Sequence, residues 1–416
     1  MKIIIIHSIV LLLSIALCSA TTIIVDPAGK TKTITAGIRQ ASTGDTVRVT
    51  AGTYREGNII ISKSLVLQGE GKPVVDGEFK TEIFTIDARH VTITGFVIRN
   101  SGMSSVKDLA GIGSIGMDFI TIRRNEFINT FFGVHLANSN YSVVEQNTFR
   151  GELRGEIETG NGIHLWQCSN SAIRDNYIAG HRDGIYFEFV TRSVVNGNVS
   201  ENNHRYGLHF MFSHDDEYHD NTFRNNGAGV AVMYTRNVKM INNIFEKNWG
   251  NSAYGLLLKD INDSEVSHNR FVQNTIGIYM EGTSRTTFVR NLFQRNGYAI
   301  RLQASCDSND FRENNFMSNT FDMATNGTLV LNTIDKNYWD KYEGYDLNRD
   351  GIGDVPFRPV NLYAMIVERV PTAVLLWRSF LVFLIDRAER VFPAVTPENL
   401  KDNYPSMKAY DLHPTT

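Results

Sequence analysis

The sequence predicts an all-β solenoid, a right-handed parallel β-helix extending over residues 21–340. Two phrases that return together indicate this fold: an asparagine followed by apolar residues, and a glycine followed by alternating apolar residues, each about every 22 residues. Self-similarity at this period marks a solenoid whose repeats bury their apolar faces by stacking on one another. Right-handed winding is the rule for parallel crossovers. The consensus of leucine-rich repeats, the rival solenoid, is absent.

The asparagine phrase predicts a repeated feature inside the coils. Most intervals are 22 or 23 residues, and the longer intervals after Asn147 and Asn243 each contain an insertion. Asparagine amides can hydrogen-bond from coil to coil as a ladder, and the aromatic residues that follow should form one internal stack. The copies are Asn125-Glu126-Phe127, Asn147-Thr148-Phe149, Asn176-Tyr177-Ile178, Asn221-Thr222-Phe223, Asn243-Ile244-Phe245, Asn269-Arg270-Phe271, Asn291-Leu292-Phe293, Asn315-Phe316 and Asn337-Tyr338-Trp339, with a weaker copy at Asn198.

The glycine phrase predicts the direction of each side chain. Its alternation has the period of a strand, and glycine opens each copy where the backbone turns sharply. In one copy, Leu208, Phe210 and Phe212 are expected to fill the interior. His209 and Met211 then face solvent. The copies begin at Gly133, Gly162, Gly184, Gly207, Gly229, Gly255 and Gly277.

Residues 1–20 are predicted to be a signal peptide. Lys2 precedes the apolar run Ile3–Leu17, and Cys18-Ser19-Ala20 supplies small residues for cleavage. The run is too short to span a membrane. The alternative is a lipoprotein anchored through Cys18. In either case we expect an exported protein.

The net charge argues against a nucleic-acid partner, and the positions of the cysteines argue against a disulfide. The net charge is −3. Cys168 and Cys306 lie six coils apart. That separation is about 29 Å at ~4.8 Å per coil, which is too far for a disulfide.

Residues 22–82 are predicted to form an amino-terminal cap over the open end of the solenoid. Ile34–Ala41 has apolar residues at positions i, i+4 and i+7, the pattern of a short amphipathic helix. Strand-like segments at Gly44–Val49 and Ser64–Gly69 then begin the coils.

Residues 341–359 form an acidic loop beyond the last repeat. Oxygen-bearing side chains stand at alternating positions around Gly351, a spacing that suits a structural Ca²⁺ site. The distal bidentate glutamate of an EF-hand is missing, and the alternative is a solvated acidic turn. The candidate ligands are Asp346, Asn348, Asp350 and Asp354.

Residues 360–416 are predicted to be a helical segment that docks a membrane partner. Leu362–Phe392 is helix-like, but its apolar run is too short to span a membrane and Arg378 interrupts it. Trp, Phe and Leu flanked by Arg are typical of interfacial segments. The alternative role is a cap over the last coil. The residues expected to dock are Val374, Leu375, Leu376, Trp377, Phe380, Leu381, Phe383 and Leu384.

A copper site is predicted on the outer face of the solenoid. Met211 and Met233 fall at equivalent positions of adjacent coils, with His209 beside Met211. Thioether with imidazole is a soft ligand set that selects Cu(I). The alternative is that these side chains pack under a loop. The supplementary candidates are Glu188, His214 and His219.

A second pair of histidines lies in the same outward column. His135 and His164 are on adjacent coils, and Cys168 follows close to His164 in the chain. This pair is the second choice for a metal site.

Several phrases of the sequence resemble the NosD family. They are Arg205-Tyr-Gly-Leu-His-Phe-Met-Phe-Ser213, Gly229-Val-Ala-Val-Met-Tyr234, Asn337-Tyr-Trp-Asp340 and the stretch Tyr345–Pro359. The first phrase is the most specific, whereas the last two recur in other repeat proteins. The resemblance extends from the cap to the carboxy-terminal helices.

The resemblance implies an exported, periplasmic accessory protein that helps to mature nitrous oxide reductase. It implies that the protein works with the ATPase and permease of an ABC transporter and with a copper chaperone. Together they would supply copper to the multicopper site of the reductase. It also implies that the carboxy-terminal helices dock the permease, so membrane contact is made through a partner.

The rival function is that of a carbohydrate-active enzyme, such as a uronate epimerase or lyase, because parallel β-helices often host such activities. Tyr206-Gly-Leu and His214-Asp215-Asp216 loosely resemble an epimerase phrase. Glu188 and Asp183 are candidate carboxylates, but no acidic pair repeats across the coils. We therefore expect the chain not to be an enzyme. A purely structural adhesin would leave the methionines unexplained.

Overall fold

The computed structural model describes residues 20–104, 106–152, 159–250, 253–327, 331–391 and 400–412. The predicted signal peptide therefore lies outside the described residues except for Ala20, and Phe392, the predicted end of the tail helix, also lies outside them. The same holds for part of each predicted insertion, namely residues 153–158 and 251–252.

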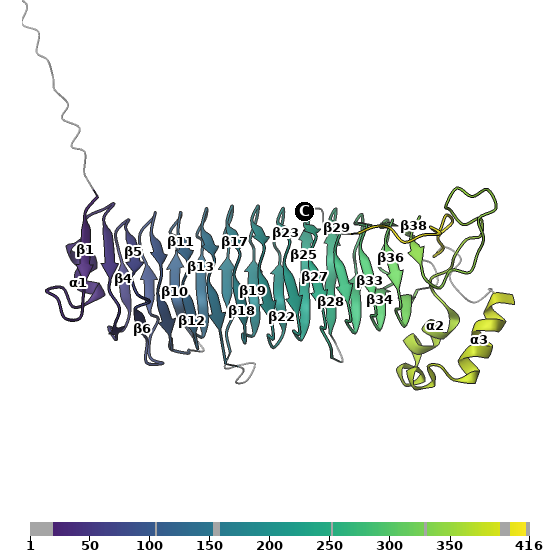
Figure 1. Cartoon of the computed structure of the whole chain (residues 1–416), viewed down its shortest axis with the longest axis horizontal. Coiled ribbons are helices and arrows are strands. Elements are labelled where there is room, and N and C mark those ends of the chain that lie inside the picture. Colours follow the sequence, from purple (N-terminus) through teal and green to yellow (C-terminus); the bar gives the residue numbers. More distant parts are fainter. Residues whose placement is uncertain are drawn as a thin grey trace, which may run out of the picture.

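The chain forms a parallel β-helix, as predicted (Figure 1). Successive coils contribute short strands to three parallel sheets of 14, 13 and 12 strands, which we call sheets A, B and C. Most strands of sheets A and B have three residues with a buried central side chain, as in β11 and β12. One apolar side chain per strand thus enters the interior, and each coil is stable only on its neighbours.

Sheet A consists of β1 (Thr22–Val25), β2 (Thr46–Val49), β5 (Val66–Gly69), β8 (Thr92–Thr94), β11 (Thr121–Arg123), β14 (Val143–Glu145), β17 (Ala172–Arg174), β20 (Val194–Asn196), β23 (Glu217–His219), β26 (Lys239–Ile241), β29 (Glu265–Ser267), β32 (Thr287–Val289), β35 (Asp310–Arg312) and β38 (Thr333–Asp335). Sheet B consists of β3 (Thr53–Tyr54), β6 (Val74–Asp76), β9 (Val97–Arg99), β12 (Glu126–Ile128), β15 (Thr148–Arg150), β18 (Tyr177–Ala179), β21 (Val199–Glu201), β24 (Thr222–Arg224), β27 (Ile244–Glu246), β30 (Arg270–Val272), β33 (Leu292–Gln294), β36 (Asn315–Met317) and β39 (Tyr338–Trp339). Sheet C consists of β4 (Ile59–Ile61), β7 (Phe84–Ile86), β10 (Ala110–Ile115), β13 (Phe132–Ala137), β16 (Ile163–Trp166), β19 (Asp183–Glu188), β22 (Tyr206–Met211), β25 (Ala228–Arg236), β28 (Tyr254–Asn262), β31 (Ile276–Glu281), β34 (Tyr298–Leu302) and β37 (Phe321–Thr325).

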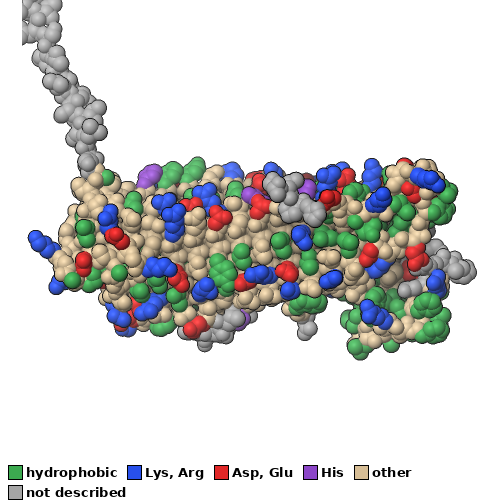
Figure 2. All heavy atoms as spheres, viewed as in Figure 1, with side chains coloured by type: hydrophobic (Ala, Val, Ile, Leu, Met, Phe, Trp, Pro, Cys, Tyr) green, Lys and Arg blue, Asp and Glu red, His purple; other side chains and the backbone are tan. Residues whose placement is uncertain are grey.

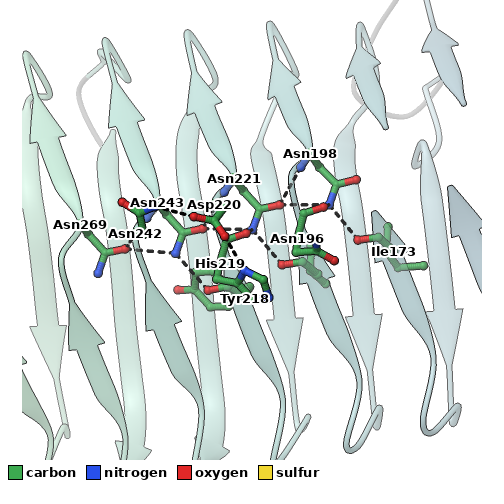
Figure 3. Close-up of polar contacts among 11 residues, drawn as sticks. Ile173, Asn196, Asn198, Tyr218, His219, Asp220, Asn221, Asn242, Asn243 and Asn269 are labelled. Carbon is green, nitrogen blue, oxygen red and sulfur yellow. Dashed lines mark hydrogen bonds and ion pairs between the residues drawn. The ribbon is translucent and has the colours of Figure 1, made fainter. Parts of the chain in front are cut away.

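The predicted asparagine ladder lies at the turn between sheets A and B (Figure 3). The side-chain oxygen (Oδ1) of Asn221 accepts hydrogen bonds from the backbone N–H and the side-chain amide of Asn198, at 2.9 and 3.0 Å. Its own amide donates to Asn243 at 3.0 Å and to the backbone oxygen of Val195 at 2.9 Å. Buried backbone groups at each turn are satisfied in this way, so the ladder replaces water inside the solenoid.

One member of the ladder differs from the prediction. Asn314, and not Asn315, links Asn291 to Asn337, with contacts of 2.9 to 3.0 Å. Asn314 lies two residues before an inward ring, as most other members do, whereas the Asn315 side chain donates to the backbone of Tyr410 at 2.9 Å.

A second asparagine ladder, which the sequence analysis missed, occupies the turn between sheets B and C. Each member follows a member of the first ladder by five residues. Neighbouring members bond in the same manner, for example Asn203 to Asn226 at 2.9 Å. The members are Asn203, Asn226, Asn248, Asn274, Asn296 and Asn319.

The aromatic stack predicted for the interior is present but divided. All its phenylalanines are fully buried. Phe127 stacks on Phe149 at 4.4 Å, and a longer run begins at Phe223. Ile178 and Ser200 occupy the two positions between these runs. The longer run continues through Phe245, Phe271, Phe293, Phe316 and Trp339.

Both ends of the solenoid are covered. At the amino end, α1 (Ile34–Gln40) buries Ile34 and Ile38 and thus matches the predicted amphipathic helix. At the other end, residues 400–412 return across the last coil. Asp402 there is fully buried and accepts hydrogen bonds from the Asn337 N–H at 2.8 Å and the Trp339 indole at 3.0 Å. Asp402 thereby ends the first ladder.

The carboxy-terminal tail is helical but broken into three pieces, α2 (Leu362–Arg369), the 3₁₀ helix η1 (Pro371–Leu376) and α3 (Phe380–Val391). The break at Val370 is expected, because the residue before a proline avoids helical geometry. The Tyr363 ring of α2 packs on Phe321 at 5.8 Å, and Glu368 pairs with Arg301 at 2.8 Å. No described helix is long and apolar enough to cross a membrane.

Candidate metal-binding site

The candidate copper ligands lie on the outer face of sheet C. The register pairs Glu188 with Met211 and Met211 with Met233 on three successive coils. His209 pairs with Ala231 in the neighbouring column. The structure therefore brings together the side chains that the sequence placed in adjacent columns. Parallel pairing sets the spacing, because equivalent positions repeat at the distance between strands.

His209 is far less exposed than predicted. Its exposed fraction is 6%, because the rings of Tyr186 and Tyr206 flank it, each 4.8 Å away. Both ring nitrogens lack a hydrogen-bond partner among the described residues, although Nδ1 is 3.7 Å from a carboxylate oxygen of Asp183. An unpaired buried imidazole is costly, and a metal ion would supply the missing partner.

The two methionines are partly exposed, so their sulfur atoms are within reach of an incoming ion. The Tyr186 hydroxyl donates to the Met211 sulfur at 3.7 Å. Burial, and then the negative charge of Glu188, raise the pKa of Tyr186 to about 12, so this hydroxyl stays protonated at neutral pH. The Tyr186 hydroxyl thus helps to hold the Met211 sulfur in place.

Phe212 is a correction to the predicted phase. It is 36% exposed and stacks between Phe189 and Tyr234, at 5.2 and 5.1 Å. The cause is the corner that follows Met211, where Phe212 has a φ of +51°. Inward and outward alternation ends at a corner, and an exposed aromatic ladder results beside the methionines.

The three supplementary candidate ligands lie in different places relative to the methionines. Glu188 adjoins Met211, as described above. His214 lies at the corner beyond Met211, where its Nδ1 is 3.5 Å from the Thr235 hydroxyl, and burial lowers its pKa. His219 belongs to sheet A and bonds Asp220 at 2.7 Å, so the structure does not place it with the methionines on sheet C.

The two histidines of the second-choice metal site also lie next to each other in the structure. The rings of His135 and His164 are 4.9 Å apart on paired positions of β13 and β16. Burial, and then the nearby His135, lower the pKa of His164 to about 3. Cys168 is not available as a ligand, because its thiol is buried on the Leu136 and Trp166 carbonyls at 3.4 Å and its pKa is raised to about 11.

The acidic loop uses its oxygens to bind its own backbone. Asp346 accepts from the N–H groups of Asp350 and Gly351 at 3.2 and 2.8 Å. Asn348 likewise accepts from Asp350, and Asp354 from Leu347. In the described parts of the chain, no three His, Cys, Asp or Glu side chains are grouped to hold a metal ion. The calcium site therefore stays a prediction.

The predicted docking residues form an apolar surface on η1 and α3, with one exception. Leu375 and Phe380 are the most open, at 85% and 73% exposure. Trp377 instead packs on Phe321 and Tyr363, at 5.3 and 5.8 Å, and anchors the tail. Figure 2 shows hydrophobic side chains gathered on the projection formed by the helical tail. The exposed members are Val374, Leu375, Leu376, Phe380, Leu381, Phe383 and Leu384.

Two comparisons bear on the family. A family model described as "Periplasmic copper-binding protein (NosD)" matches residues 152–349, which include the methionine pair. A "Probable ABC transporter binding protein NosD" of Pseudomonas aeruginosa is 26% identical over 414 residues, covering 86% of this chain and 87% of the relative. Both comparisons therefore show that the chain is similar to the NosD family. The NosD match and the three-sheet solenoid agree with the resemblance seen in the sequence.

Solved structures show the same fold outside the NosD family. A GH87 α-1,3-glucanase of Streptomyces thermodiastaticus has a TM-score of 0.62 at 15% identity, covering 76% of this chain and 67% of the enzyme. The A-module of an Azotobacter vinelandii mannuronan C-5 epimerase has a TM-score of 0.51 at 14% identity, covering 70% and 89%. Likeness at such low identity establishes the fold alone.

Proposed function

We propose that this chain binds Cu(I) in the periplasm through Met211, Met233 and His209. We further propose that it works with an ABC transporter and a copper chaperone to mature the multicopper site of nitrous oxide reductase. The supporting observation is the pairing of two thioethers on adjacent coils beside an unpartnered imidazole. Soft thioether ligands favour Cu(I) over hard cations, and the family is described as copper-binding.

The charges around the methionines support binding of a cation. On one side Met211 adjoins the carboxylate of Glu188. On the other side Met233 adjoins Lys259, whose ammonium group is 3.5 Å from Glu281 and so is compensated. Methionine sulfur is neutral, so a nearby carboxylate offsets the charge of the ion.

The methionine pair also suits transfer from one protein to another. Both side chains are partly exposed on an outer face, so a partner can approach the ion directly. Neither thioether has to lose a proton in order to bind. Together these features favour passing on the ion over permanent storage.

The tail is the proposed docking element for the membrane partner. It projects from the end of the solenoid and exposes apolar side chains such as Leu375 and Phe380 (Figure 2). A patch of this kind on a folded protein marks an interaction site. The relative named as an ABC transporter binding protein supports a transporter as the partner.

We also propose that the chain carries out no catalysis on polysaccharides. The candidate acid Asp183 is fully buried, and its two carboxylate oxygens accept from Arg205 at 3.1 and 3.0 Å. An acid held in this way is unsuited to proton transfer with a sugar ring. Incubation with alginate or oligouronates should give no new reducing ends and no change in epimer composition.

The test of copper binding is the double substitution Met211→Leu with Met233→Leu, which nearly conserves side-chain volume. Cu(I) affinity, measured by competition with a colorimetric chelator, should fall at least tenfold in the folded variant. Met317→Leu is the matched control, because Met317 is partly exposed on sheet B. Unchanged affinity in the double variant would remove the methionines from the site.

A further inference from the structure

A column of rings runs along the outer face of sheet C beside the methionines. The rings of His135 and His164 are 4.9 Å apart, those of His164 and Tyr186 are 4.7 Å apart, and those of Tyr186 and His209 are 4.8 Å apart. The register fixes each neighbour. This column lies outside the aromatic core, so the interior of the solenoid does not depend on its rings.

One of the two histidines at the far end of this column, His164, has ring nitrogens without a hydrogen-bond partner among the described residues. Both of these nitrogens are also out of solvent contact. His135 beside it is 9% exposed. A buried polar group without a partner costs about 1–3 kcal/mol. A ligand that accepts nitrogen lone pairs would recover this cost.

We propose that His135 and His164 form a second Cu(I) site, separate from the methionine pair. The proposal rests on the function above, since it assigns a second position for the same ion. A metal–nitrogen bond is about 2 Å, so an ion between two imidazoles joins nitrogens about 4 Å apart. The ring centroids are 4.9 Å apart and the rings are tilted by 53°, so one ion can reach a nitrogen of each ring after the side chains rotate.

The surroundings favour a soft monovalent ion at this second site. The Phe132 ring lies 5.6 Å from the His135 ring and 5.4 Å from the His164 ring, so an apolar wall faces both imidazoles. Among the described residues, no three His, Cys, Asp or Glu side chains are grouped to hold a metal ion, so harder divalent ions lack a full ligand set here. Cu(I), with its filled d shell, is stable with two nitrogen donors.

The consequence is that one face of the solenoid holds two copper ions in different donor sets. One set contains sulfur, and the other contains nitrogen alone. Tyr186 separates His164 from His209 along the column, and Met211 lies in the neighbouring column on the same strand as His209. The two sites can therefore be removed independently.

The test compares three proteins loaded anaerobically with Cu(I): wild type, His135→Gln with His164→Gln, and Met211→Leu with Met233→Leu. Copper per chain should be two in wild type and one in each double variant. X-ray absorption should show sulfur neighbours of copper in the histidine variant and nitrogen neighbours alone in the methionine variant. The exposed His268→Gln is the matched control and should bind two.

Distinct outcomes separate the two claims. Two copper ions in the folded histidine variant would overturn the second site and leave the methionine site intact. Loss of nitrogen-bound copper in the histidine variant, with no change in the methionine variant, would support the second site and refute the first. If the double variant folds poorly, His135→Gln alone keeps the imidazole of His164, whose ring nitrogens lack a partner among the described residues, and should still lose the second ion.

Discussion

Replacing Asn243 by alanine tests whether the asparagine ladder stabilises the coils that bear the methionines. Asn243 is fully buried and makes four side-chain hydrogen bonds. Its carbonyl accepts from the Asn221 N–H at 3.1 Å, and its amide donates to the Tyr218 oxygen at 3.0 Å. Asn243 follows Met233 by ten residues, as Asn221 follows Met211. The link therefore joins the two methionine coils directly.

The expected loss follows from the groups left without partners. Asn221 and Asn269 keep other side-chain contacts, so the main cost falls on the Asn221 N–H and the Tyr218 oxygen. Two unpaired buried groups at about 1–3 kcal/mol each predict a loss of roughly 4 kcal/mol in the free energy of unfolding. A change of this size is exceptional for one substitution.

Urea unfolding followed by circular dichroism measures this loss. If the coils uncouple, the transition should also split into two steps, because a solenoid is stabilised by its nearest-neighbour interfaces. Asn58→Ala is the control, since exposed Asn58 only accepts from the Thr85 hydroxyl and its loss should cost less than about 1 kcal/mol. An Asn243→Ala protein as stable as this control would refute the reasoning.

Three further predictions concern the tail, the end cap and pH. Leu375→Asp with Phe380→Asp should leave the unfolding midpoint unchanged, because both side chains are exposed, but should abolish co-purification with the transporter; retained assembly would reduce the tail to a cap. Asp402→Ala should lower stability by about 3 kcal/mol, since buried donors of the last coil lose their acceptor, and a measured loss below about 1 kcal/mol would contradict that role. Burial lowers the pKa of His181 to about 4 from 6.5, so the unfolded chain binds the proton first, and stability should fall as pH drops from about 6.5 towards 4. The loss due to His181 at pH 5 is about 2 kcal/mol, and His181→Gln should reduce the pH dependence of urea unfolding by that amount while the contribution of His164 remains.

The sequence was sufficient for the features that repeat with the coil. The ladder, the core rings and the pairing of Met211 with Met233 all follow from one offset of about 22 residues. Stacking in a solenoid is a translation along one axis, so equal offsets in sequence become adjacent positions in space. The error at Asn315 arose because two asparagines stand side by side, and only the position of the next inward ring distinguishes them.

The adjacency of Met211 and Met233 was predicted from the sequence, but the surroundings of His209 were not. His209 was expected to face solvent, yet Tyr186 and Tyr206 enclose it. The signal was available, because Tyr186 stands in the same outward column, but periodicity does not show how far a side chain leans across its neighbours. Phe212 was wrongly predicted to face the interior. The strand ends at Met211, and the inward and outward alternation of side chains does not continue through the corner that follows.

By itself, the sequence determined the coil, its register and the columns of side chains, because these depend only on spacing along the chain. Only the tertiary structure decided which outward residues are enclosed, which imidazole nitrogens lack partners, and where the tail breaks into separate helices. These properties depend on side chains from neighbouring coils and distant segments that meet in space. The unpartnered ring nitrogens of His209 and His164, on which both proposed copper sites depend, belong to this second group.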